Sequence, residues 1–252
     1  MTTKEEVSHI LSQIDERPFI QLMYASVSEV SSDSKVKDIL EPIKTSVRCA
    51  CLMDLYAETE NAVFLREFEA QRRKFYSLVP KQVHTELQTL EAEVKDFFQY
   101  ELQLRMKLRR SEKFTSEEIT RYLLGKSSDN VFYGRLLELI VPEWNLTNEL
   151  RIQTILFDIG KDIEDYEQDA HSGFPNILNM FLTQKLEASK VPTNPVEAIE
   201  LASRFGISNE ILGLATGYRT QAVANPELAK APSLQAAINR NFTRIEEALK
   251  SR

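Results

Sequence analysis

The chain has 252 residues and carries 31 Lys and Arg against 38 Asp and Glu, which gives a formal charge of −7. Hydrophobic residues make up 42% and charged residues 27%, proportions typical of a globular protein with a buried core. The acidic balance argues against a nucleic-acid binder, which needs basic charge to displace phosphate counterions. With 7 Gly and 9 Pro, the chain has few residues for a turn-rich all-β fold or for glycine-rich phosphate loops.

The two cysteines, Cys49 and Cys51, would point about 200° apart on a helix, so we expect no disulfide between them. Two lone thiols favour the reducing cytoplasm. The first residues have no basic and no apolar signal-peptide region, and the longest apolar runs are far shorter than the roughly 20 residues that span a bilayer. We therefore expect a cytoplasmic protein without a transmembrane segment.

Helical periodicity dominates the chain, and the alternation typical of strands is almost absent. In the first half we expect helices over residues 4–14, 18–30 and 81–110, and one long helix from Ser34 to Val79, which Pro80 ends. The polar residues 31–34 are a candidate N-cap for the long helix.

The second half is expected to begin with a capping box, Thr115 with Glu118, that opens a helix through Leu124, where Gly125 breaks it. Further helices are expected over residues 130–141 and 145–169, the latter with Asn145 as N-cap, followed by a turn at 172–175. Short helices and a final helix from Leu234 complete the chain. The pattern predicts one all-α domain, residues 1–252, with nine to eleven helices.

Four aspartates share one face of the helix expected over residues 145–169. At about 100° per residue, they fall within an arc of about 60°, directly beside an apolar face; they are Asp158, Asp162, Asp165 and Asp169. Like charges at this spacing repel one another, and more strongly near a core, so something should compensate them. Mg²⁺, which prefers hard oxygen ligands, is one candidate. A solvated acidic face is the other interpretation.

A second acidic patch lies in the expected helix after Ser34. An apolar stripe runs through Leu40, Ile43, Val47 and Cys51, and its next positions are Asp54 and Glu58. Acids on a core-facing stripe are rare unless they are paired, bind a metal or line a cavity. A helix that turns this face to solvent would explain them equally well.

These motifs resemble class I isoprenoid synthases. Asp158-Ile-Gly-Lys-Asp162 is similar to the second aspartate motif of squalene and phytoene synthases, and Phe157 to Tyr166 resembles the F-Q-I-x-D-D-x-x-D-Y region of trans-prenyl diphosphate synthases, with Lys161 in place of its first Asp. Asp54-Leu-Tyr-Ala-Glu58 is similar to the first motif. Lys126-Ser127 stands where prenyl diphosphate synthases carry Lys-Thr.

The resemblance implies a helical bundle around a central cavity, in which two acidic helices face each other. It implies a terpene synthase or prenyltransferase that ionises an allylic prenyl diphosphate, with Mg²⁺ held by Asp54, Glu58, Asp158, Asp162, Asp165 and Asp169. Among these, Asp54, Asp158 and Asp162 would be catalytic. Lys126, by its family position, and Arg151 and Lys161, on or beside the acidic face, would bind the diphosphate. Homodimers are common in the family.

Two other interpretations compete with the enzyme. A non-catalytic all-α subunit or adaptor on the same scaffold would use the acids structurally. A ferritin-like metal bundle would require a Glu-x-x-His motif on each of two helices, and the sequence has a single one, Glu6 to His9.

Overall fold

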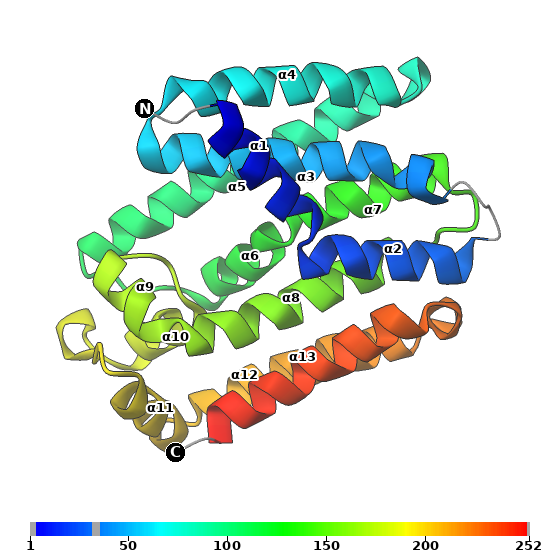
Figure 1. Cartoon of the computed structure of the whole chain (residues 1–252). Coiled ribbons are helices and arrows are strands. Elements are labelled where there is room, and N and C mark those ends of the chain that lie inside the picture. Colours follow the sequence, from blue (N-terminus) through cyan, green and yellow to red (C-terminus); the bar gives the residue numbers. More distant parts are fainter. Residues whose placement is uncertain (1–3, 32–35, 251–252) are drawn as a thin grey trace. The chain divides into compact units, whose positions relative to one another are not determined.

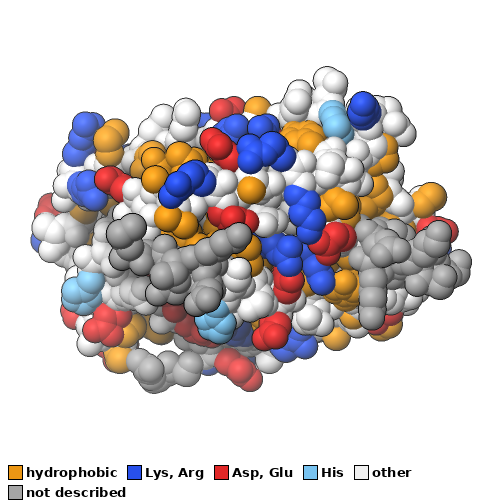
Figure 2. Space-filling model, turned by 45° about the horizontal axis from the view of Figure 1, so that its top comes forward, with side chains coloured by type: hydrophobic (Ala, Val, Ile, Leu, Met, Phe, Trp, Pro, Cys, Tyr) orange, Lys and Arg blue, Asp and Glu red, His pale blue; other side chains and the backbone are white. Residues whose placement is uncertain are grey.

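A computed structural model describes residues 4–31 and 36–250, apart from the side chains of residues 4–6, 36–39, 54, 57 and 58. The described residues form 13 α-helices and three short 3-10 helices, with no strand, which confirms the all-α prediction (Figure 1). The count exceeds the nine to eleven helices expected. None of the described helices is both long and apolar enough to cross a bilayer. Figure 2 shows one face, on which both signs of charge are mixed with hydrophobic side chains.

The helices group into two compact units along the chain. The first comprises residues 1–89, 135–145 and 230–233, and the second comprises residues 90–134, 146–229 and 234–252. The first unit contains α1 (Lys4–Asp15), α2 (Pro18–Val30), α3 (Val36–Thr59) and α4 (Ala62–Leu78). In it α3 packs against α1, α2 and α4. Part of its core is built by Val7, Leu52 and Phe64, which come from α1, α3 and α4.

The long helix expected from Ser34 to Val79 is in fact two helices, so that prediction was wrong. Glu60, between α3 and α4, adopts a positive φ of 53°, which ends α3. Asn61 then caps α4, because its side-chain oxygen accepts a hydrogen bond from the Val63 amide at 3.0 Å. The apolar stripe of α3 is buried as expected, from Leu40 to Cys51. The N-cap expected at residues 31–34 falls largely outside the described residues.

The first unit also contains η1 (Lys81–Val83), and boundaries between the units fall within α5 (His84–Arg109) and α7 (Ser128–Ile140). The second unit further contains α6 (Ser116–Lys126), α8 (Thr147–Glu164), α9 (Tyr166–Ser172), α10 (Ile177–Lys185), η2 (Ala188–Lys190), α11 (Pro195–Arg204), α12 (Ile207–Val223) and η3 (Pro226–Lys230). Most of α13 (Pro232–Lys250) also belongs to it. Of these, α6, α9, α10 and α12 all pack against α8. The helix that carries the acidic face is therefore also an organising element of this unit's core.

Two boundaries in the second unit differ from expectation. Gly125 does not break α6; its missing Cβ makes room for the Phe97 ring, from which a Cβ would lie 1.9 Å away. Asn145 is not the N-cap, because α8 begins at Thr147. The helix expected over residues 145–169 is also interrupted at Asp165, where ψ of 6° separates α8 from α9.

Candidate functional site

The helix that positions the candidate site is capped as the sequence predicted. Thr115 Oγ1 accepts the Glu118 amide at 3.1 Å, and the Glu118 carboxylate accepts the Thr115 amide at 2.8 Å. The Glu118 carboxylate also pairs with Lys107 Nζ of α5 at 2.7 Å. The capping box fixes where α6 begins, and hence which residues of its last turns lie next to α8.

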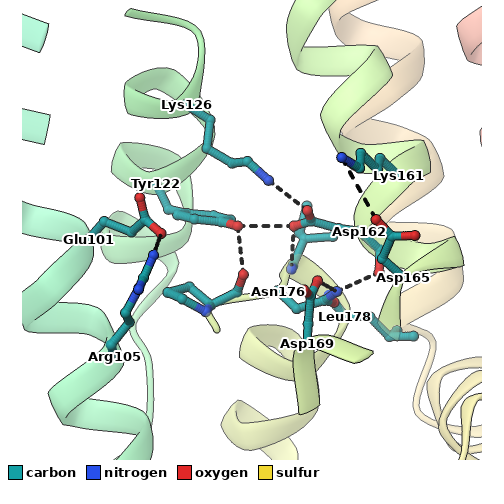
Figure 3. A network of polar contacts seen from close by, with 12 residues as sticks. Glu101, Arg105, Tyr122, Lys126, Lys161, Asp162, Asp165, Asp169, Asn176 and Leu178 are labelled. Carbon is teal, nitrogen blue, oxygen red and sulfur yellow. Dashed lines mark hydrogen bonds and ion pairs between the residues drawn. The ribbon is translucent and has the colours of Figure 1, made fainter. Parts of the chain in front are cut away.

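Asp162, on α8, is the centre of a polar network that joins α6, α8 and the start of α10 (Figure 3). It is only 3% exposed. Its Oδ1 accepts a hydrogen bond from Lys126 Nζ at 2.7 Å, while its Oδ2 faces the Tyr122 hydroxyl at 3.2 Å and accepts the Ile177 amide at 2.9 Å. We call Asp162, Lys126, Tyr122, Asn176 and the Ile177 amide the Asp162 network. Three donors thus surround this buried carboxylate.

Tyr122 joins α6 to the segment before α10. Its hydroxyl lies 2.8 Å from the Pro175 carbonyl oxygen and 3.2 Å from Asp162 Oδ2, so its single proton faces two acceptors. Burial, and then the charge of Asp162, raise the pKa of Tyr122 well above its ordinary value. The hydroxyl therefore stays protonated and serves as a donor at every physiological pH.

Asn176 ties the network to the acid of α9. Its Nδ2 donates to the backbone carbonyl of Asp162 and to Asp169 Oδ2, the latter at 2.8 Å. Its Oδ1 accepts the Leu178 amide at 3.0 Å and so caps α10. One buried side-chain amide therefore connects α8, α9 and α10 through hydrogen bonds. Burial raises the pKa of Asp169, and the hydrogen bond from Asn176 opposes this rise.

Asp158 lies one turn before Asp162 on α8 and is the acid with free oxygens. Among the described residues it has no hydrogen bond and no ion pair. Burial raises its pKa to about 7; Lys126 opposes this rise, while the charges of Asp162 and Asp129 add to it. A carboxylate whose pKa lies this close to 7 has a high affinity for a proton or another cation.

Lys126 pairs with Asp162 and interacts electrostatically with Asp158. Burial alone would lower its pKa, but the charges of Asp162, Tyr122 and Asp158 together raise it well above its ordinary value. Its side chain is 24% exposed, and its ammonium group is paired with Asp162. Lys126 therefore stays a cation at physiological pH.

Arg151, expected to bind diphosphate, caps the end of α6 instead of standing free. Its Nη2 donates to the Leu124 carbonyl and its Nε to Ser127 Oγ, both at 3.2 Å. Leu124 is two residues before Lys126, so Arg151 stabilises the turn from which Lys126 projects.

The remaining predicted residues of α8 and α9 lie farther from this centre. Lys161 is largely exposed and pairs with Asp165 at 3.9 Å, one turn along the same helix. Asp169 accepts a hydrogen bond from Asn176 of the Asp162 network. It also lines a pocket of about 170 Å³, together with the end of α5 and residues of α10. This pocket does not include Asp158, Asp162 or Lys126.

Asp54 and Glu58 lie within α3, but their side chains lie outside the described residues. Among the side chains that the structure describes, no group of three or more His, Cys, Asp or Glu residues is arranged to hold a metal ion. The described site is therefore a paired carboxylate, Asp162, beside Asp158, which has no hydrogen bond or ion pair among the described residues, and the cation Lys126 pairs with Asp162.

Sequence reasoning missed the neutral partners of Asp162. Tyr122 lies on α6 one turn before Lys126. This spacing does not show whether its hydroxyl is a buried hydrogen-bond donor or its ring is simply part of the core. Asn176, after the Gly-Phe-Pro turn and before an apolar run, had a readable N-cap signal. Its second role, as a donor to Asp162 and Asp169, depends on the tertiary fold.

Comparison with known proteins gives no relative: no family model, no curated protein and no solved structure matches this chain.

Proposed function

We propose that this chain is a Mg²⁺-dependent enzyme that ionises an allylic prenyl diphosphate, as a terpene synthase or prenyltransferase. The proposal includes the bundle fold of class I isoprenoid synthases around a central cavity. It rests on the motif resemblance and on one structural observation. Asp158, a carboxylate with no hydrogen-bonding partner among the described residues, lies beside the partly exposed cation Lys126.

The donor set of this site fits a magnesium ion shared with a diphosphate. Mg²⁺ usually takes one or two protein carboxylates and completes its shell with water and phosphate oxygens, so a cluster of three acids is not required. Asp158 offers two oxygens, and its pKa of about 7 reflects repulsion and burial that a cation would relieve. Asp162 is engaged by three donors and fits a positioning role better than that of a ligand. The roles of Asp54 and Glu58 stay predictions from the sequence, since their side chains lie outside the described residues.

When bound, the metal would supply neutralisation of charge on the diphosphate leaving group. The protein's own residues have distinct tasks in this proposal. The Lys126 ammonium binds diphosphate oxygens. Asp162 and Tyr122 fix the direction of the Lys126 side chain, and Arg151 fixes the end of α6 from which it projects.

The test is diphosphate release from geranyl, farnesyl and geranylgeranyl diphosphate, with and without Mg²⁺. We expect Mg²⁺-dependent release from at least one substrate, and its loss in Asp158→Asn. Glu164→Gln, on the same helix but paired with Arg244, is the matched control and should retain release. A second readout is the melting temperature with inorganic diphosphate: Mg²⁺ should raise it for the wild-type chain and not for Asp158→Asn.

The second candidate is a non-catalytic protein on the same scaffold. The observation that favours it is that Asp162 already accepts hydrogen bonds from three donors, as expected of a structural ion pair. In that case no substrate would release diphosphate, and Mg²⁺ with diphosphate would leave the melting temperature unchanged. Those two results together would exclude the enzyme.

A further inference from the structure

The outer face of α5 carries three large apolar side chains that are open to solvent. Phe98, Leu102 and Met106 are 45%, 58% and 49% exposed. They are four residues apart, so they form one row along the helix, which we call the α5 stripe. Most large apolar side chains of this protein are buried, and single exposed ones need no explanation, whereas a row of three is a candidate contact surface.

Basic side chains surround the α5 stripe. Taking Leu102 as zero at about 100° per residue, Lys95, Arg105 and Arg109 all fall within about 60° of it. The two acids between residues 95 and 109, Asp96 and Glu101, fall about 100° or more away on either side. Between residues 95 and 109 this arc carries three cations and no acid, in a chain with more acids than bases, and Glu91, one turn before Lys95, is the acid of α5 that falls within the same arc.

Two of the three cations of this arc take part in no ion pair within the described part of the protein. Lys95 and Arg109 form none among the described residues. Arg105 pairs with Glu101 at 2.7 Å and stacks over the ring of Phe174, 3.9 Å from its centroid, which adds another exposed aromatic side chain beside the stripe. The helix dipole accounts for Arg109 in the last turn, but not for Lys95, four turns earlier.

The charges disfavour a second copy of the chain as the partner of this face. In a two-fold contact, if one residue of the first copy meets a second residue of the other copy, the reverse contact also forms. Antiparallel α5 helices centred on Leu102 would therefore bring Lys95 of each copy next to Arg109 of the other. Like charges would then face each other at both ends of the apolar row. The complementary partner is apolar at its centre and anionic around it, a description that fits the interface of an acidic lipid bilayer.

We propose that the α5 stripe and its three cations form a peripheral docking surface for anionic lipid membranes. The apolar side chains enter the boundary between headgroups and acyl chains, and the cations contact lipid phosphates and carboxylates. This docking requires no membrane-spanning helix and does not depend on the proposed diphosphate chemistry.

The experiment is flotation of the full chain with vesicles of phosphatidylcholine alone or of phosphatidylcholine with 30% phosphatidylserine, a composition of roughly the acidity that polybasic surfaces respond to. The chain should float with the acidic vesicles at low salt and not with the neutral ones. Because the Debye length falls to about 3 Å at 1 M salt, that salt concentration should release most of it.

Two double variants separate the apolar and the ionic contributions. Leu102→Gln with Met106→Gln should weaken partitioning about tenfold or more, because it removes two inserting side chains. Lys95→Gln with Arg109→Gln should weaken it about 25-fold, about fivefold for each cation near the surface. The matched controls are Val223→Gln, an exposed apolar residue of α12, and Arg240→Gln, an exposed cation of α13, and both should float like the wild-type chain.

Circular dichroism should show every variant folded, since all the altered side chains are exposed. The proposal is overturned if the wild-type chain does not float with acidic vesicles, or if the double variants float as well as the controls. Sedimentation gives a further decisive result: a wild-type dimer that the Leu102 and Met106 variant converts to monomer would assign the face to a second copy instead.

Discussion

The acidic face of α8 and the basic face of α5 both place like charges at helical spacing, but their surroundings differ. On α8, Asp162 is buried and held by Lys126, Tyr122 and a backbone amide. On α5, Lys95 and Arg109 are exposed and have no ion-pair partner among the described residues. A charge in the core must be paired within the fold because its desolvation is costly, whereas a charge at the surface is free to pair with something external.

The largest effect is expected from Asp162→Ala, which would leave the Lys126 ammonium and the Ile177 amide without their acceptor. Removing one partner of a buried pair typically costs about 3–5 kcal/mol, and urea unfolding measures it. Glu164→Ala, which breaks the exposed pair with Arg244, should cost about 0.5–1 kcal/mol. Equal losses would contradict the distinction between buried and exposed charge.

The next effect concerns the dependence of stability on pH. The folded-state pKa of Asp158, about 7, is above its unfolded value of 3.8. The contribution of the protonated Asp158 to the free energy of unfolding is therefore fully present below pH 4 and is lost as the pH rises through 7. Asp158→Asn should remove this loss and stabilise the chain by about 2–4 kcal/mol at pH 8, with little change at pH 4. Denaturant unfolding at both pH values measures it. A wild-type stability that is flat between pH 4 and 8 would show that Asp158 is solvated.

A smaller effect is expected where the inner face of α5 packs on α6. Gly125→Ala would place a Cβ 1.9 Å from the Phe97 ring and should destabilise the chain by about 1–3 kcal/mol through overpacking. Gly213→Ala, in α12, meets no atom within 4 Å and should stabilise by up to about 1 kcal/mol. Thermal unfolding of the two variants compares them, and a neutral Gly125→Ala would mean that Phe97 turns aside without strain.

The smallest effect is expected on the outer face of α5. Arg109→Gln should change the free energy of unfolding by no more than about 0.5 kcal/mol, because no ion pair holds this side chain in the described part of the protein. Urea unfolding of Arg109→Gln and of Asp162→Ala under the same conditions compares the two free energies of unfolding. A cost above 1 kcal/mol would show that α5 uses its basic face for folding.

Part of the candidate site could be predicted from the sequence, because helical spacing alone places Asp158 and Asp162 on one face beside the core. Lys126 was predicted from a motif resemblance, and its contact with Asp162 depends on the packing of α6 against α8. The contacts of Arg151 with α6 could not be predicted, because helical angle puts Arg151 on the acidic face without showing that the end of α6 lies within its reach.

The sequence by itself determined the all-α class, most helix positions, the α6 capping box and the burial of the α3 stripe, because these follow from local capping chemistry and from apolar periodicity. The tertiary structure decided which acid of the α8 face is paired and which is free. Asp158 and Asp162 are the same residue type one turn apart. Only the positions of Tyr122, Lys126 and the Ile177 amide, brought from α6 and α10 by packing, make one a satisfied buried anion and the other an acid with a pKa near 7.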